Sequence, residues 1–200
     1  MERRRAFTSR STSKGRGRLS TITNSTFVSL DGVINHMERW HFDYIDEQSN
    51  TVALEQLRAA DALLMGRHTY DVYANAWPGR DGEIAELINA MTKYVASTTL
   101  ETADWQNTTV MRGDLVDGVT QLKGGPERIL MHGYGPVAKT LVRHGILDEL
   151  ILWIHPVLAG VGTATDVIFT DGLHRQLTLH DTKPLDSGVV VLSYWVDRDR

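Results

Sequence analysis

The spacing of apolar residues changes repeatedly along this 200-residue chain. A repeat of two indicates a β-strand with one buried face, whereas spacings of three and four indicate one face of an α-helix. Alternating or short apolar runs bounded by turn residues predict strands at residues 25–30, 62–65, 94–97, 108–111, 128–131, 149–154, 176–181 and 189–196.

Helical spacing occupies most of the intervals between these runs. The clearest apolar face, at i, i+3, i+4 and i+7, is formed by Ile84, Leu87, Ile88 and Met91. Similar spacing predicts helices around residues 53–60, 115–122 and 137–142. Pro136 suits the first turn of the last of these helices, and Gly145 suits its end.

Strands that alternate with helices predict a mostly parallel, twisted sheet covered by helices on both faces, which is a three-layer α/β/α architecture. No helix is predicted between the last two strands, so the C-terminal edge of the sheet should contain an antiparallel pair. No internal repeat or linker interrupts the chain after Arg18. We therefore predict one folded domain over residues 19–200.

The composition is that of an ordinary globular protein, with 42% hydrophobic and 23% charged residues. Cysteine is absent, which excludes disulfides, a thiol nucleophile and the Pro-Cys-x-x-Cys zinc ligands of nucleoside deaminases. We expect no metal site. The best apolar run, residues 150–154, is far too short to span a membrane, so no membrane partner is expected.

The formal charge of −4 is unevenly distributed. Residues 1–18 contain seven Lys or Arg and one Glu, which gives +6 and leaves −10 on residues 19–200. An acidic domain argues against nucleic acid as the main partner. The basic segment 1–18 has almost no apolar residues, which predicts a disordered tail. A solvated extension, a transit-type peptide and an anion-binding arm remain open as its role.

Ligands of open α/β sheets bind where the carboxyl ends of strands lead into helices. At one such junction the predicted strand 62–65 is followed by Gly66-Arg67-His68-Thr69, and a helix should begin near Thr69. Gly66 permits close backbone approach, and free helix N–H groups together with Arg67 would form an anion site. The alternative is an ordinary strand-to-helix turn with an exposed arginine.

Two further junctions have suitable residues. Ser97-Thr98-Thr99 follows the predicted strand 94–97, where the hydroxyls would bind phosphate or ribose, or cap the next turn. The predicted strand 128–131 enters Gly133-Tyr134-Gly135 directly before a helix, which suits a pyrophosphate. This last segment lacks the third glycine of the usual dinucleotide fingerprint, so each junction is a weak signal by itself.

In this order the three junctions resemble the dihydrofolate reductase superfamily. The resemblance implies that Gly66, Arg67, His68 and Thr69 hold cofactor phosphates and that Ser97 and Thr98 lie beside an adenosine 2′-phosphate. It also implies that Gly133, Tyr134 and Gly135 lie along the pyrophosphate. A pocket for the 2′-phosphate implies NADPH rather than NADH as the cofactor.

Five further segments resemble the bacterial deaminase-reductase C-terminal domain, the reductase module of riboflavin biosynthesis, which has many stand-alone relatives. They are Ser29 to Gly32, Trp77-Pro78, Lys93 to Ser97, Leu147 to Leu150 and His155 to Gly160. The resemblance covers roughly residues 23–195. It implies a dihydrofolate reductase-like fold, a cytoplasmic homodimer, and hydride transfer from NADPH to a small heterocycle or sugar.

The candidates on the substrate side are fewer. Asp31 leaves the first strand at the expected mouth of the site, and as a carboxylate it would bind substrate N–H groups and relay a proton; an Asp-Gly turn is its alternative role. Trp40 and Phe42 form either an aromatic wall over the substrate or ordinary packing. The resemblance places Trp77 near the substrate, although loop packing suits it as well. His155 lies at a strand end, where it either faces the site or has a structural role, and we expect the structural role.

We therefore expect an NADPH-dependent oxidoreductase that acts on a small heterocyclic molecule. The nearest named activity is reduction of 5-amino-6-(5-phosphoribosylamino)uracil. A dihydrofolate or pterin reductase is the enzymatic alternative, although the acid that true dihydrofolate reductases carry on their first helix has no convincing counterpart here. A non-catalytic NADPH-binding protein is the alternative from another class.

Overall fold

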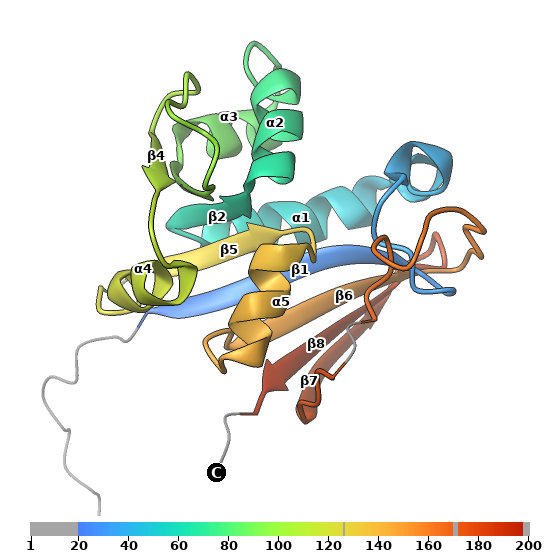
Figure 1. The fold of residues 1–200 in the computed structure, drawn as a ribbon. Helices are drawn as coiled ribbons and strands as arrows, with labels where there is room; N and C mark the ends of the chain where they lie inside the picture. The colour runs from blue at the N-terminus through green and yellow to red at the C-terminus, as the bar shows by residue number, and fades with distance from the viewer. Residues whose placement is uncertain (1–19, 126, 170–171, 198–200) are drawn as a thin grey trace, which may run out of the picture.

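The computed structural model describes residues 20–125, 127–169 and 172–197. The predicted disordered tail, residues 1–18, lies outside these ranges. The described chain folds around one eight-stranded sheet with the strand order β4-β3-β2-β5-β1-β6-β8-β7. Figure 1 shows the sheet with its helices on either side.

Parallel strands form most of the sheet. They are β1 (Thr21–Ser29), β2 (Ala62–Gly66), β3 (Thr92–Ala96), β4 (Thr108–Met111), β5 (Arg128–His132) and β6 (Glu149–His155). The C-terminal edge is antiparallel, because β8 (Val190–Val196) pairs antiparallel with both β6 and β7 (Leu177–Pro184). The predicted mostly parallel sheet with an antiparallel C-terminal edge is confirmed.

Helices lie at the predicted positions, although the first begins at Glu47 rather than near residue 53. They are α1 (Glu47–Ala59), α2 (Arg67–Ala76), α3 (Glu83–Ala90), α4 (Leu115–Leu122) and α5 (Pro136–Arg143). Two short 3-10 helices, η1 (Met37–Arg39) and η2 (Phe42–Tyr44), lie in the connection from β1 to α1. Helix α2 begins at Arg67 rather than near Thr69, so the helix N-terminus lies directly at the end of β2.

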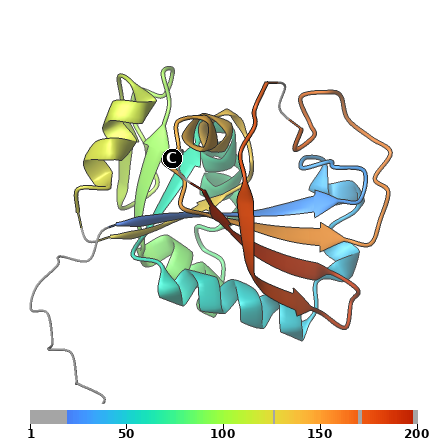
Figure 2. The ribbon, with the colours of Figure 1, turned by 90° about the horizontal axis from the view of Figure 1, so that it is seen from below.

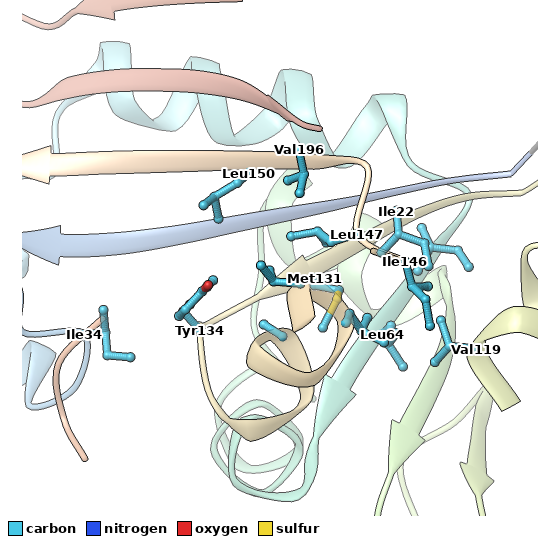
Figure 3. Close-up of a cluster of buried hydrophobic side chains, with 14 of the residues drawn as sticks. Ile22, Ile34, Leu64, Val119, Met131, Tyr134, Ile146, Leu147, Leu150 and Val196 are labelled. Atoms are coloured by element: carbon cyan, nitrogen blue, oxygen red, sulfur yellow. The ribbon is translucent and has the colours of Figure 1, made fainter. Parts of the chain in front are cut away.

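Two layers of side chains cover the sheet. The residues of α4 and α5 pack against one face, in the core cluster drawn in Figure 3, which contains Val119 together with Leu64 and Ile22 of the sheet. On the opposite face Leu57 of α1, Tyr70 of α2 and Ile88 of α3 pack against the sheet. Figure 2 shows α1 and α3 together beneath the sheet. We call this opposite layer the α1 face.

One charged side chain is buried in the α1-face layer. Lys93 of β3 has no solvent-exposed surface, and its Nζ donates to the carbonyls of Asn89, Met91 and Gln106 at 2.9, 2.7 and 3.2 Å. The same ammonium lies 4.5 Å from the ring centroid of Trp105. Lys93 thus ties the end of α3 to the segment that precedes β4.

No helix within the described ranges is long and apolar enough to cross a membrane.

Candidate functional site

The parallel order of the sheet brings two of the predicted junctions together at its carboxyl edge. Strands β2 and β5 are neighbours, so the segments that follow them lie side by side. A Cβ built on Gly66 would lie 3.1 Å from Cγ2 of Val137, in the first turn of α5. A Cβ on Gly133 would lie 3.4 Å from Oγ1 of Thr69, in the first turn of α2. Both glycines therefore permit close packing of one junction on the other.

Gly133 has a second reason to be glycine. Its φ of +79° lies in the left-handed region, where a side chain is strained. Its carbonyl accepts a hydrogen bond of 2.8 Å from Nδ2 of Asn24, which is fully buried in the adjacent β1. The turn after β5 is thus fixed by the sheet beneath it and by α2 beside it.

The N-termini of α2 and α5 differ from those of α1 and α4. Helices α1 and α4 are each capped by a carboxylate, because Asp46 accepts from the Ser49 amide and Asp114 accepts from the Asp117 amide. Helices α2 and α5 have no acid in the first turn, and no side chain of the described residues caps them. Their first N–H groups and helix dipoles therefore remain available for an external anion.

Space for such an anion exists beside α5. A Cβ built on Gly135, the residue at the N-cap of α5, would meet no atom within 4 Å. Tyr134 contributes only its backbone here, since its ring is buried in the core near Ile34 (Figure 3). The two neighbouring, uncapped helix ends fit a diphosphate group, which is the chemistry that a dinucleotide cofactor would present.

The hydroxyl junction lies one strand away from this anion site. Strand β3 pairs with β2 so that Ala96 faces Gly66, and Ser97 follows directly. Ser97 Oγ accepts from the amides of Thr99 and Leu100 at 3.2 and 3.0 Å, whereas Thr98 is exposed. Ser97 therefore organises its own turn, and its neighbour Thr98 presents a hydroxyl to solvent.

Arg67 directly follows Gly66 and is paired. Its Nε donates to both carboxylate oxygens of Asp71 at 2.8 Å, and both side chains are close to half exposed. The pair lines a groove of about 700 Å³ between α2 and the segment 100–106. His68 is exposed beside it. Among the described residues Asp71 engages only Nε, so the two terminal nitrogens of the guanidinium can bind other acceptors.

A second set of polar groups lies on the α1 face of the same edge. The hydroxyl of Tyr73, on α2, and Nδ1 of His132, at the end of β5, are 2.8 Å apart. Burial raises the pKa of Tyr73 and lowers that of His132 to about 4. The phenol is therefore protonated and the imidazole neutral at physiological pH.

The aromatic residues predicted near the substrate have different environments. Trp77 is half-buried and packs against Tyr73, with a ring-centroid distance of 5.8 Å, so it lies beside the Tyr73–His132 pair. Trp40 is buried, and its indole N–H donates to the Asn35 carbonyl. Phe42 is 61% exposed and points away from the core.

Asp31 is engaged in a loop contact. Its carboxylate accepts from the Ser29 hydroxyl at 2.5 Å and from the amides of Ala159 and Gly160 at 2.9 and 2.8 Å. These hydrogen bonds lower the pKa of Asp31 to about 2, with that from Ser29 the largest cause. Such a carboxylate stays ionised and joins the turn after β1 to the loop after β6, which is the geometry of the turn alternative.

Sequence reasoning missed a pair of buried histidines. Nδ1 of His41 and Nε2 of His155 are 2.9 Å apart, although the two residues are separated by 113 others in the sequence. The ring of His41 stacks on Phe27 at 4.0 Å, and that of Trp40 packs edge-on against His155 at 5.1 Å. The only signal in the sequence was the position of His155 at a strand end.

The chain matches the model of the RibD C-terminal domain family over residues 20–191. It is similar to the Uncharacterized protein YyaP of Bacillus subtilis (strain 168), with 29% identity over 174 residues that span 84% of this chain and 90% of that protein.

Two solved structures are also similar. One is a protein of Shewanella sp. PV-4 that is provisionally named for riboflavin biosynthesis, with a TM-score of 0.70 and 20% identity over 90% of this chain and 100% of that one. The other is a pyrimidine reductase-like protein from Corynebacterium diphtheriae, with a TM-score of 0.66 and 16% identity over 92% of this chain and 94% of that one. At these identities the likeness establishes the fold, which is the dihydrofolate reductase-like architecture expected from the sequence.

Proposed function

The chain belongs to the RibD C-terminal domain family, and we propose that it is an NADPH-dependent reductase that transfers a hydride to a small heterocyclic substrate. Membership of this family supports an oxidoreductase of the riboflavin-pathway type. NADPH would supply the hydride. The protein would bind and orient the reactants, exclude water and assist proton transfer to the substrate.

The observation that carries the proposal is the contact between the two uncapped helix ends. Gly66 packs on Val137 and Gly133 lies against Thr69, so the N-termini of α2 and α5 converge at the carboxyl edge. We assign the cofactor diphosphate to their free N–H groups, and the 2′-phosphate to Arg67, which lines the nearby groove, and to Ser97 and Thr98, which follow β3.

From the same arrangement we infer where the substrate that accepts the hydride binds, which we call the acceptor side. The Tyr73–His132 pair joins α2 to the end of β5 on the α1 face, next to Trp77. These groups are neutral and lie beside an aromatic ring, which suits a flat heterocycle. The nearest named acceptor remains 5-amino-6-(5-phosphoribosylamino)uracil, and the pyrimidine reductase-like name of the Corynebacterium structure is consistent with this substrate class.

Cofactor binding is the first test. NADPH at 100 times its Kd should stabilise the protein by about 2.7 kcal/mol, seen as a higher Tm, and NADH should give a much smaller shift. Arg67→Ala should weaken NADPH binding at least tenfold, while Arg143→Ala, at the far end of α5, serves as the matched control. An unchanged Tm with saturating NADPH would contradict the proposal.

Turnover then distinguishes the alternatives. Oxidation of NADPH with the phosphoribosyl pyrimidine supports the riboflavin-type reductase. Methotrexate-sensitive oxidation with dihydrofolate would instead indicate a pterin reductase. NADPH binding without turnover on either substrate would indicate a non-catalytic binding protein. The expected homodimer and cytoplasmic location stay predictions, to be tested by light scattering and by fractionation.

A further inference from the structure

The connection from β1 to α1 contains a segment, residues 36–45, that packs against the protein through Trp40 and His41 but forms few hydrogen bonds with it. Its backbone hydrogen bonds close on itself, within η1 and η2. Trp40 donates to the carbonyl of Asn35, which directly precedes the segment. Within the described ranges, the only other hydrogen bond from this segment to the rest of the molecule is that of His41 with His155. A 3.8 Å ion pair of His36 with Asp166 adds to it when His36 is protonated.

The hydrogen bonds of His155 fix the arrangement of protons. Nδ1 of His155 lies 2.9 Å from the carbonyl of Trp153, which can only accept, so Nδ1 carries the proton. Nε2 of the neutral ring is then an acceptor, and His41 donates to it from Nδ1. Nε2 of His41 is left with its lone pair. Both rings are buried, with 8% and 1% of their surfaces exposed, and this burial outweighs the Trp153 and Val28 carbonyls beside His155, so it favours the pair as two neutral imidazoles.

The pair closes one side of a notch on the α1 face. The notch has a volume of about 70 Å³ and is lined by Phe27, Tyr44, Asn50 and Trp153 together with both histidines. Trp153 donates from its indole N–H to Oγ of Ser25, and Ser25 lies in register with His132 on the neighbouring strand. The notch therefore lies on the same face as the Tyr73–His132 pair, two strands away along the carboxyl edge.

We propose that His41 and His155 are positioning residues, which in their neutral form hold segment 36–45 closed against Phe27 at the acceptor side and release it when they take up a proton. The consequence for substrate rests on the proposed function: the acceptor would enter with the segment open and be shielded from water with it closed. The contact between His41 and His155 itself requires neither cofactor nor acceptor.

The other residues that line the notch around the pair are uncharged, so burial is the main cause of the shifted pKa values of the two histidines. Segment 36–45 contributes Tyr44, whose ring lies 5.6 Å from that of His155, and β1 and β6 contribute the uncharged Phe27 and Trp153. Helix α1 contributes Ser49, Asn50 and Ala53, and Val189 lies beyond β6. Asp46, at the start of α1, is occupied with the Ser49 amide.

Closure of segment 36–45 should depend on pH through the two histidines. Burial, and secondarily the charge of His155, lowers the pKa of His41 from 6.5 to about 4, and burial also lowers the pKa of His155. When the segment is open, His41 is exposed to water and takes up a proton at its ordinary pKa of 6.5. The closed form is therefore fully favoured above about pH 6.5 and loses its advantage as the pH falls toward 4. The 3.8 Å pair of His36 with Asp166 lies at the surface and contributes little to closure.

Hydrogen exchange of the Trp40 indole N–H measures the opening directly. After correction for the intrinsic exchange rate, its protection should fall about 30-fold between pH 8 and pH 5, from the two pKa values of His41. The Trp105 indole N–H, which donates to Asn89 far from the segment, is the internal reference and should change little. A flat Trp40 profile in the unmodified protein would overturn the proposal.

Variants assign the effect to the pair. His41→Phe/His155→Phe keeps two aromatic rings without a titrating group, and its Trp40 protection should change less than about threefold over the same range. His41→Gln, which keeps a hydrogen-bond donor, should give an intermediate profile and replaces the double variant if that does not fold. His180→Gln, a control on the exposed strand β7, should retain the 30-fold response. Persistence of the full response in both His41 variants would contradict the assignment, and none of these outcomes bears on NADPH binding.

Discussion

The hydroxyl of Tyr73 and Nδ1 of His132 are joined by a hydrogen bond of 2.8 Å that connects the second turn of α2 to the last residue of β5. His132 directly precedes Gly133, and Tyr73 lies one helical turn after Thr69, so the bond runs parallel to the Gly133–Thr69 contact. The two walls of the candidate cofactor site are thus linked twice. Because Tyr73 stays protonated and His132 neutral, this link should be insensitive to pH over the physiological range.

Removing the phenol hydroxyl tests the link. Tyr73→Phe leaves Nδ1 of His132 buried without its partner, which should cost about 1–3 kcal/mol of the free energy of unfolding. Urea denaturation measures the change, and NADPH binding should weaken at the same time because α2 is less well held. Tyr94→Phe is the matched control, because the Tyr94 hydroxyl donates to Glu127 over the longer distance of 3.3 Å. Equal costs for the two variants would show that the Tyr73 bond has no special importance.

The close approach of Gly66 to Val137 predicts a defect that can be repaired. In Gly66→Ala the new Cβ would lie 3.1 Å from Cγ2 of Val137, so α5 has to move by a few tenths of an ångström. We expect about tenfold weaker NADPH binding with only a small loss of stability. Adding Val137→Ala removes the opposing methyl group and should restore most of the affinity, measured by fluorescence titration. Failure of the second substitution to rescue would mean that the spacing of α2 and α5 is not what Gly66 controls.

Most of the fold could be predicted from periodicity, and each exception has a physical cause. Strand β1 begins at Thr21 rather than at residue 25, because its polar start pairs with β5 and buries Asn24 through a hydrogen bond to Gly133. Helix α2 begins at Arg67, since a helix N-terminus without a capping side chain gives no local signal. The 3-10 helices η1 and η2 were not predicted, because each is a single turn with no apolar period.

The candidate site also has parts that the sequence predicts and parts that it does not. The cofactor junctions follow their strands in the sequence, so the parallel topology brings Gly66 and Gly133 together once the strands are known. The contacts of the α1 face join residues far apart in the chain, and no local pattern predicts that His41 meets His155 or that Tyr73 meets His132. A buried polar pair of this kind is defined only by tertiary packing.

Asp71 should modulate the selectivity for NADPH over NADH. Its carboxylate neutralises Arg67, and it would also repel a 2′-phosphate placed beside that arginine. Asp71→Asn should therefore tighten NADPH binding about threefold to tenfold at low salt, leave NADH binding unchanged, and lose the effect in 1 M salt. Asp117→Asn, on the exposed surface of α4, is the control. If NADPH binding instead weakens, Asp71 serves mainly to orient the guanidinium.

The role of Asp31 can be decided by a backbone measurement. In Asp31→Ala the amides of Ala159 and Gly160 lose their acceptor, so their hydrogen exchange should accelerate strongly. In the unmodified protein the same amides should lose protection only in acid, as the pH falls from about 3.8 toward 2, because the folded-state pKa of Asp31 is lowered. Asp31→Asn with intact amide protection but no turnover would instead indicate the proton-relay role considered from the sequence.

Lys93 should be among the least replaceable residues outside the site. Its Nζ satisfies three backbone carbonyls and lies over the ring of Trp105, so Lys93→Met leaves those carbonyls without a donor in a buried position. We expect a loss of about 2–4 kcal/mol in the free energy of unfolding, measured by urea denaturation at pH 7. Lys93→Arg should not rescue the loss, because the larger planar guanidinium does not fit a pocket built for three convergent bonds to one nitrogen. Lys183→Met, which removes an exposed lysine paired with Glu55 at 3.5 Å, should cost less than about 1 kcal/mol. A small effect of Lys93→Met, comparable to that of Lys183→Met, would show that water replaces the ammonium and that the end of α3 does not depend on it.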